Sequence, residues 1–454
     1  MGVFRITAKP QSGGLLFQAA SVYPIVALRL AFGFSMFLWA LMMMFSGRVS
    51  AIYSPELIHI PYRGLEWVQP LPVWAMYGVF SGIALSALAL GAGWFFRRSA
   101  FVFTLLFAYA ALIDQASYLS YYYFVLLLAV MLLLSPAHRN FSIDLIRKPE
   151  IRIDYIPRWL LLAFQLQVAM VFFFAGMAKL NADWLFSGAQ MSSWVNNSIE
   201  QLGWSLHIPG WLPMAFSWMM LLFDFIIPHF LFDQRTSYRA FWVVLMVQTI
   251  GFILLPTGIF PLLMILACTV FLPAERIHNF FSRVAYFLYD VFEFKGDVFQ
   301  PGGNFMLQFK VRFLFPLLAL MFIGIQVFAP VVMYLQIGSV RWANSAFHFS
   351  AEMPINTQFT DLQFYSKNTL TGQIDRIDVE QLLTPEQKMR ISSDTTLVEG
   401  FITQLREKSE LGLNKPEILI EAKHCNFTAE GRMECRTLTV PFDESNFAAA
   451  YTED

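Results

Sequence analysis

The sequence predicts a polytopic α-helical membrane protein with a small α+β domain at its C-terminal end, and three observations support this fold class. Hydrophobic residues make up 57% of the 454 residues and charged residues only 14%. The mean hydropathy is +0.53, far from the value of a soluble globular domain. The charges are unevenly spread, since 29 of the 63 Asp, Glu, Lys and Arg residues fall in the last 114 residues. We therefore predict a helical membrane domain over 1–339 and a water-exposed domain over 340–454.

The charge balance and the N-terminal segment indicate which partners and which kind of first apolar segment to expect. The formal net charge is −1, which argues against a nucleic-acid partner. Residues 1–14 are polar, and a long apolar segment follows them without a small-residue cleavage site. This pattern is typical of a first transmembrane helix rather than of a cleaved signal peptide.

Nine segments are candidates for membrane-spanning helices, each of which needs about 20 apolar residues. The third and fourth are short and are joined through Asp114-Gln115, so they could form one hairpin or a partly re-entrant loop. The seventh and eighth meet at Pro256-Thr257-Gly258, a natural break. We expect nine spans, with eight or ten as alternatives. The candidates are 22–45, 72–95, 100–114, 118–135, 157–179, 209–232, 240–256, 258–273 and 312–336.

The orientation follows from the Lys and Arg residues of the short loops, which favour the cytoplasmic side. A cytoplasmic N-terminus places most basic loop residues inside, whereas the outer loop 180–208 contains no Lys or Arg. Nine spans then place the C-terminal tail outside the cytoplasm. We expect a multi-pass protein of the cell membrane, specifically of a bacterial inner membrane. Within loop 274–311, apolar residues at helical spacing predict an amphipathic helix on the inner surface of the bilayer.

The tail has the pattern of an α+β domain. We predict strands over Gln358–Tyr365 and Gly372–Val379, a helix over Leu397–Lys408 and a hairpin that turns at 429–431. This hairpin register would make Cys425 and Cys435 direct cross-strand partners. A disulfide between them is plausible in an oxidising compartment, and two unpaired thiols are the alternative.

One stretch, FFFAGMAKLNADW (Phe172–Trp184), carries a lysine where the fifth span ends. A Lys at the edge of hydrocarbon can lose solvation and become a usable base. The alternative is an interfacial anchor, in which Lys179 reaches the headgroups and Trp184 sits in the aromatic belt.

Other polar residues at membrane depth suggest a site near this lysine, because such residues are costly in lipid. Asp114 lies at the outer end of spans three and four, beside a tyrosine cluster, where it is either a site residue or a polar turn residue. Asp224 could bond a neighbouring helix or pair with Lys179. No spacing of a metal site is visible, so we predict no metal. The predicted pocket residues are Tyr118, Tyr122, Gln165, Asn181, Asp183, Trp184, Asp224 and Gln248, with Lys179, Tyr121 and Asp114 as the catalytic candidates.

The motif resembles the signature of the vitamin K-dependent γ-glutamyl carboxylases and of the wider horizontally transferred transmembrane (HTTM) family. Other segments agree in order, so the resemblance covers most of the chain. These segments are SPAHRNFSID (Ser135–Asp144), GIFPLLMILACTVFLP (Gly258–Pro273), RWANSAFHFSAEM (Arg341–Met353) and PEILIEAKHCNFTAEGRM (Pro416–Met433).

The resemblance implies a specific chemistry. The lysine matching Lys179 would deprotonate reduced vitamin K, either menaquinol or phylloquinol. Oxygen would convert this quinol to its epoxide through a strongly basic alkoxide, which removes a γ-proton from a glutamate of a protein or peptide substrate. The carbanion would then take up CO2. Besides the lipid bilayer, the expected partners are the lipid-soluble quinol and this Glu-containing substrate on the outer face.

The sequence also departs from the carboxylase pattern. Tyr121 and Gln248 stand where the family carries histidines, and Ala351-Glu352 replaces a Trp-Asp pair. A tyrosine cannot replace imidazole as a proton shuttle near neutral pH. Two functions therefore stay open: a carboxylase-like enzyme, and a non-catalytic HTTM-family scaffold whose outward domain binds a partner. A transporter is a weaker third, because no paired broken helices are visible.

Overall fold

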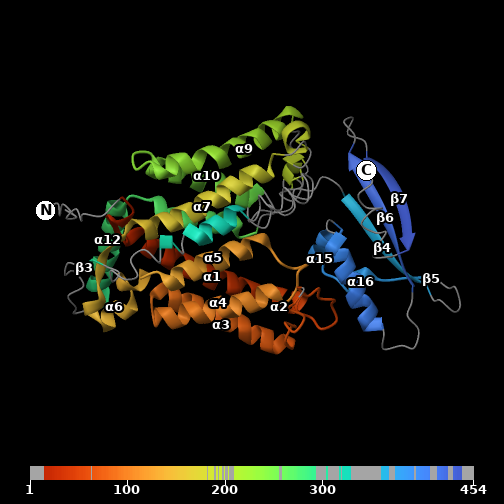
Figure 1. Cartoon of the computed structure of the whole chain (residues 1–454), viewed down its shortest axis with the longest axis horizontal. Coiled ribbons are helices and arrows are strands. Elements are labelled where there is room, and N and C mark those ends of the chain that lie inside the picture. The colour runs from red at the N-terminus through yellow and green to blue at the C-terminus, as the bar shows by residue number, and fades with distance from the viewer. Residues whose placement is uncertain are drawn as a thin grey trace. The chain divides into compact units, whose positions relative to one another are not determined.

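The structure, a computed structural model, is mostly helical and carries two small sheets (Figure 1). The chain forms two compact units. Unit 1 comprises Met1–Trp39, Gly82–Thr104 and Ser120–Pro354, and unit 2 comprises Ala40–Ser81, Leu105–Leu119 and Ile355–Asp454. The structure describes residues 15–62, 64–180, 183–188, scattered positions between 191 and 203, 209–254, 258–292, 303–304, 316–317, 320–328, 359–367, 374–392, 395–409, 417–427 and 433–441. The predicted domain boundary at 339/340 lies outside these residues and stays a prediction.

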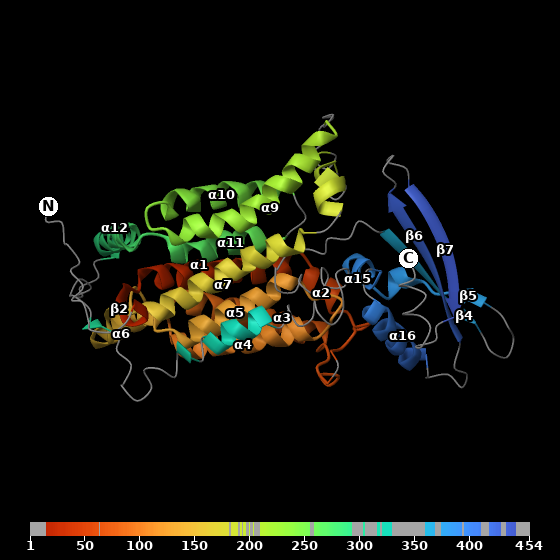
Figure 2. The same ribbon diagram turned by 45° about the horizontal axis from the view of Figure 1, so that its top comes forward.

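Among the residues that the structure describes, four helices are long and apolar enough to cross a membrane, and they coincide closely with four of the predicted spans. Two of them, α7 and α9, run side by side in unit 1 together with α10, as both views show (Figures 1 and 2). The protein is therefore a multi-pass membrane protein. The four helices are α1 (Tyr23–Phe45), α3 (Val73–Ala92), α7 (Arg158–Ala178) and α9 (Trp211–Phe232).

The remaining predicted spans correspond to shorter or bent helices in the described part of the chain. The helix α11 (Phe260–Ala267) continues as the turn η5 (Cys268–Phe271) and then bends by 106° into α12 (Ala274–Phe292); counted as one span, this pair would be the fifth. Segment 312–336 is described only at 316–317 and 320–328, which are helical. The count of nine and the orientation stay predictions. The shorter helices are α4 (Phe96–Leu112), α5 (Ser120–Leu134) and α10 (Ser237–Leu254). Two five-residue helices lie in connections: α2 (Arg48–Ile52) between α1 and α3, and α6 (Ile143–Arg147) between α5 and α7.

The amphipathic helix predicted within loop 274–311 forms as α12. Its Ile277 and Phe281 are buried, whereas Phe280 is exposed. The ring of Phe281 stacks on Phe141 at 4.7 Å, and His278 meets Tyr23 edge-on at 4.8 Å. One face of α12 therefore packs on the rest of unit 1. The position of α12 on the membrane surface stays a prediction.

Two glycines allow α1 and α3 to approach each other closely. A Cβ atom on Gly33 would lie 2.4 Å from the Cα of Gly91, closer than any real Cβ contact. Small residues at helix crossings allow such approach in membrane proteins, where dispersion contacts rather than the hydrophobic effect hold helices together. The crossing of α1 and α3 thus depends on Gly33.

A buried arginine fixes the loop that follows α5. Arg29 of α1 donates to the carbonyl oxygens of Gly91 (3.1 Å), Ala137 (2.7 Å) and Asn140 (3.2 Å), and also to that of Phe141. Carbonyl groups that face away from water need such donors. Beside this loop, β1 (Ala19–Ser21) pairs antiparallel with β2 (Ile153–Pro157), which pairs parallel with β3 (Gly303–Asn304).

The tail forms a four-stranded antiparallel sheet in the order β5-β4-β6-β7. Two helices, α15 (Pro385–Ile391) and α16 (Thr395–Ser409), lie beside one face of it (Figure 2). The helix predicted over Leu397–Lys408 is therefore confirmed as α16, and the strand predicted over Gln358–Tyr365 as β4. The strands are β4 (Phe359–Lys367), β5 (Ile374–Arg376), β6 (Glu417–Phe427) and β7 (Met433–Pro441).

The strand predicted over Gly372–Val379 is too long. The observed β5 ends at Arg376, because the side chain of Asp378 accepts a bond from the backbone N–H of Glu380 at 3.2 Å and starts the turn η7 (Val379–Gln381). Asp side chains commonly compete with strand pairing in this way.

The core of unit 2 draws on residues from far apart in the sequence. Ile58 and Ile60, from the loop after α2, pack into one buried cluster with sheet and helix residues of the tail. A Cβ atom on Gly400 of α16 would lie 2.5 Å from a methyl carbon of Ile60, so that helix lies directly on the loop. The tail therefore does not build its core alone. The tail members are Leu362, Phe364, Val379, Leu383, Ile391, Leu397, Val398, Phe401 and Ile402.

The predicted hairpin register is confirmed, because Cys425 pairs with Cys435 between β6 and β7. The structure describes the backbone but not the side chains of these two residues. The disulfide therefore stays a prediction.

Replacing Gly33 by Ala tests the α1–α3 crossing. We expect destabilisation by about 1–3 kcal/mol, because the added methyl group meets backbone atoms that cannot move aside. Gly78→Ala on α3 is the matched control, since nothing lies within 4 Å of its Cβ position. Thermal unfolding in detergent measures both, and an unchanged midpoint for Gly33→Ala contradicts the close approach.

Peptide mapping without reductant tests the disulfide. We expect segments 417–427 and 433–441 to appear as one cross-linked species that separates on reduction, because the register places the two cysteines opposite each other. Cys425→Ser supplies the uncross-linked control. Separate peptides in the unreduced wild type would show free thiols.

Candidate functional site

The lysine of the signature motif is buried at the end of α7. Lys179 caps this helix, and its side chain is only 2% exposed. Its Nζ atom donates to Oδ2 of Asp224 on α9 at 2.8 Å and to the carbonyl oxygen of Ala175 at 3.3 Å. A headgroup anchor needs its nitrogen at the protein surface, so this geometry argues against the anchor interpretation.

The tryptophan of the motif covers the same ammonium group. The Nζ atom of Lys179 lies 5.6 Å from the centre of the Trp184 ring, within the range of a cation–π contact. Trp184 is buried in the π-helical turn η4 (Asp183–Ser187), and its Nε1 donates to the carbonyl oxygen of Ser217 at 2.8 Å. The turn after α7 therefore places an aromatic ring beside Lys179.

Gly176 of the motif allows α9 to approach α7 closely, and this approach brings the Asp224 carboxylate to Lys179. A Cβ atom on Gly176 would lie 2.9 Å from Cζ of Phe225, the residue that follows Asp224. The rings of Phe172 and Phe223 meet edge-on at 5.9 Å across the same interface. Aromatic side chains thus pack across the α7–α9 interface that also contains the Lys179–Asp224 pair.

Electrostatics explain why the two charges occur together. A single charge in a medium of low dielectric constant costs several kcal/mol, whereas a close pair with further hydrogen bonds offsets much of that cost. Asp224 is 7% exposed in its side chain, so both partners are dry. The pair carries no net charge and is therefore tolerable within the membrane domain.

The glutamines of the helical unit connect helices, and the two on α7 lie more than three turns before Lys179. Gln167 of α7 and Gln326 exchange two amide hydrogen bonds, at 3.1 and 2.9 Å. Gln165 donates to the carbonyl oxygen of Val270 in η5 at 3.1 Å, and Gln248 is half-buried on α10. Gln165 thus bonds the protein itself, and its predicted place in a substrate pocket stays a prediction, as does that of Gln248.

The predicted tyrosine cluster is divided between the two units. In unit 1, Tyr121 and Tyr122 are buried and meet edge-on at 5.0 Å. A Cβ atom on Gly258, at the break before α11, would lie 3.8 Å from the Tyr121 ring. Tyr118 belongs to unit 2, where it meets Tyr62 at 6.2 Å. The pocket role of Tyr118 and Tyr122 and the catalytic role of Tyr121 stay predictions.

Asp114, in the turn between α4 and α5, is bonded to the tail within unit 2. Its carboxylate accepts bonds from the backbone N–H groups of Ile60 (2.9 Å), Ala116 (3.1 Å) and Ser117 (3.0 Å), and from the Ser117 hydroxyl. It also accepts a bond at 2.8 Å from Nε2 of Gln387 on α15. The Asp114 carboxylate therefore connects three segments of unit 2 through hydrogen bonds. This is a structural role, and the predicted catalytic role stays a prediction.

Sequence reasoning missed two residues beside Asp114. Gln387 is fully buried and also donates to the carbonyl oxygen of Ile58 at 3.1 Å. His59 lies between the two core isoleucines, and neither of its buried ring nitrogens has a hydrogen-bond partner in the described part of the chain. Burial lowers the pKa of the His59 imidazole, opposed by the Asp114 carboxylate. The Thr384…Gln387 capping-box pattern could have predicted the helix but not its partner.

Two predicted residues of the motif cannot be placed. Asn181 and the side chain of Asp183 lie outside the described residues. Among the described residues, no group of His, Cys, Asp or Glu side chains could hold a metal ion.

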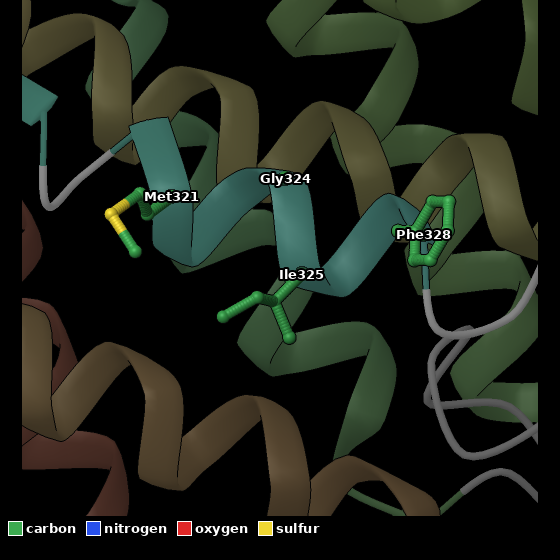
Figure 3. Close-up of a pocket in the computed structure, with 4 residues that line it drawn as sticks. All are labelled: Met321, Gly324, Ile325 and Phe328. Carbon is green, nitrogen blue, oxygen red and sulfur yellow. The ribbon is translucent and has the colours of Figure 1, made fainter.

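A shallow apolar hollow lies along the helical segment 320–328 (Figure 3). Met321, Gly324, Ile325 and Phe328 line it, and its volume is about 350 Å³. All four residues are exposed, whereas Gln326 of the same segment is buried against α7. None of the lining side chains can carry a proton, so this hollow is typical of a lipid-facing surface rather than of a catalytic site.

The role of Asp114 can be tested by Asp114→Ala. We expect a loss of at least about 2 kcal/mol in unit 2, because several buried donors lose their acceptor. Hydrogen exchange in β4 and α16, with thermal unfolding, measures this loss. Asp378→Ala is the matched control, since that exposed carboxylate also accepts two hydrogen bonds. Unchanged protection of α16 in Asp114→Ala would contradict the connecting role.

Comparison with known families agrees with this architecture. The HTTM domain family model matches residues 17–275, more than half of the chain. The model of the vitamin K-dependent gamma-carboxylase lumenal domain matches residues 312–438. No solved structure matches the chain. The chain therefore belongs to the HTTM domain family and is a carboxylase-like member of it.

Proposed function

We propose that the protein is a membrane enzyme that deprotonates a lipid-soluble quinol at the Lys179–Asp224 pair. The observation that carries this proposal is the dry ion pair inside the family's signature motif. Perturbed, water-excluded ionisable groups are typical of catalytic sites, although purely structural pairs also occur. The expected substrates are menaquinol or phylloquinol, with O2 and CO2 as co-substrates and no metal.

The surroundings of the pair suit a quinol ring. The ring of Trp184 lies 5.6 Å from the ammonium nitrogen, a cation–π contact of the kind that a quinol ring could also make. The neighbouring Leu180 and Phe186 are exposed apolar residues, as expected of a surface that faces lipid. A quinol dissolved in the bilayer could therefore enter laterally without crossing water.

The pair can hold the proton that the quinol releases. In the ion pair the nitrogen of Lys179 is already protonated, so the group that can accept a further proton is the carboxylate of Asp224. The Lys179 ammonium passes a proton to Asp224, and the resulting amine accepts the proton of the quinol hydroxyl. One O–H bond breaks on the quinol and one forms on Asp224, while the Lys179 ammonium faces the quinol anion and stabilises its charge.

Later steps rest on the family resemblance. Oxygenation of the quinol would supply the strong base, and a Glu-containing protein or peptide at an extracytoplasmic tail would receive CO2. Tyr121 and Gln248 would shape the pocket rather than shuttle protons, because neither side chain titrates near neutral pH. In this proposal the lysine–aspartate pair does the proton transfer for which the related carboxylases also use histidine.

A non-catalytic scaffold is the second candidate. The observation that favours it is the completeness of the bonding, since both Lys179 and Asp224 already have partners inside the protein. The outer turn and the tail also share one core in unit 2. In this alternative the pair only holds α7 to α9, and the tail binds a partner protein.

Turnover assays separate the two candidates. Purified protein is incubated with reduced menaquinone or phylloquinone, oxygen, labelled bicarbonate and a Glu peptide, and both quinone epoxide and peptide label are measured. We expect Lys179→Met to lose at least about 100-fold in epoxide formation, the usual contribution of a positioned base.

Two controls protect this assay against misfolding. Lys179→Met leaves Asp224 buried without its cation, which destabilises the fold by about 3–5 kcal/mol. The double variant Lys179→Met/Asp224→Leu removes both charges, and we expect it to fold but not to turn over. Arg235→Gln removes an exposed cation that belongs to neither candidate site and should keep full activity. No epoxide and no peptide label from the wild type would support the scaffold.

A further inference from the structure

A basic and aromatic surface lies where α3 ends and α4 begins, far along the chain from the signature motif. We name it the Phe95 surface. It combines the α3–α4 turn with α6 and the residue after it, and all its members are exposed. They are Trp94, Phe95, Arg98, Ile143, Ile146, Arg147 and Lys148.

The backbone of this turn is strained in a way that exposes the ring. Phe95 has a φ angle of 43°, in the left-handed region that bulky residues rarely adopt. The carboxylate of Asp144 on α6 holds this conformation by accepting bonds from the N–H groups of Phe95 (2.9 Å) and Phe96 (3.0 Å). Strain of this kind persists only where the surroundings enforce it, and it is common at binding sites.

Two guanidinium groups converge on the exposed ring. Cζ of Arg147 lies 4.6 Å from the centre of the Phe95 ring, and Cζ of Arg98 lies 5.7 Å from it. Neither arginine forms an ion pair within the described part of the chain. The carboxylate of Asp144 is engaged with backbone donors. Two like charges over one ring repel each other, so a bound anion would relieve that repulsion.

The geometry points to the headgroup of an anionic phospholipid as this anion. Guanidinium groups match phosphate oxygens in two-point hydrogen bonding. Trp94, Ile143 and Ile146 add exposed apolar area around the charges, which a soluble phosphate would leave in water. The membrane-crossing helix α3 ends at Ala92, two residues before Trp94, so the surface lies at the depth of the headgroups. Basic clusters directly beside a transmembrane helix attract anionic lipids.

Binding of defined lipids to the purified full-length protein in detergent tests this inference. Phosphatidylglycerol is titrated, with phosphatidylcholine of the same acyl chains as the neutral lipid and inorganic phosphate as the soluble anion. Native mass spectrometry counts the bound lipids and gives the affinity. We expect the wild type to prefer phosphatidylglycerol, and Arg98→Gln/Arg147→Gln to bind it roughly ten- to thirty-fold more weakly, as loss of two basic contacts predicts.

A charge-matched control separates a site from diffuse attraction. Arg235→Gln/Arg239→Gln removes two exposed arginines near the α9–α10 turn, and we expect it to keep nearly wild-type affinity. Arg98→Lys/Arg147→Lys keeps both charges, and its binding should fall between those of the wild type and the Gln variant. Equal losses in both Gln variants, no preference over phosphatidylcholine, or equal binding of inorganic phosphate would overturn the proposal. If Arg98→Gln/Arg147→Gln does not fold, the affinity of Arg98→Lys/Arg147→Lys and the preference of the wild type for phosphatidylglycerol decide the proposal.

Discussion

The cost of placing a charge in a dry interior governs the helical part of this protein. The ammonium group of Lys179 is tolerated because the carboxylate of Asp224 lies 2.8 Å away and the carbonyl oxygen of Ala175 accepts a further bond. The close approach of α7 and α9 that brings these groups together depends in turn on the missing side chain of Gly176. The close contact of α7 with α9 and the pairing of Lys179 with Asp224 therefore meet the same requirement, which is that a buried charge be compensated.

The same requirement explains the other buried polar groups. Arg29 satisfies carbonyl oxygens of α3 and of the loop after α5, and Gln167 and Gln326 satisfy each other's amides. Asp114 satisfies donors of the loop after α2 and of α15. Because each of these groups has partners on separate segments, the polar residues act as connections between helices that apolar packing alone would leave free to slide.

The tail, the loop after α2 and the turn between α4 and α5 belong to one compact unit. Ile58 and Ile60 complete a core whose other members come almost entirely from the tail, and Gln387 reaches back to Asp114 and to the carbonyl oxygen of Ile58. A substrate or partner that binds this unit would therefore act on segments from both matched family domains at once. The Phe95 surface of unit 1 differs, since neither Arg98 nor Arg147 forms an ion pair among the residues that the structure describes.

The sequence by itself determined the membrane class, the positions of the long helices and the hairpin register that pairs Cys425 with Cys435. These features depend on composition, on the length of apolar runs and on the two-residue period of strands, all of which are local. Only the tertiary structure decided that Asp224 is the partner of Lys179, that Asp114 bonds Gln387, and that Ile58 and Ile60 belong to the core of the tail. Those contacts join residues tens to hundreds of positions apart, and a single sequence contains no local signal for which distant helix or loop a side chain will meet.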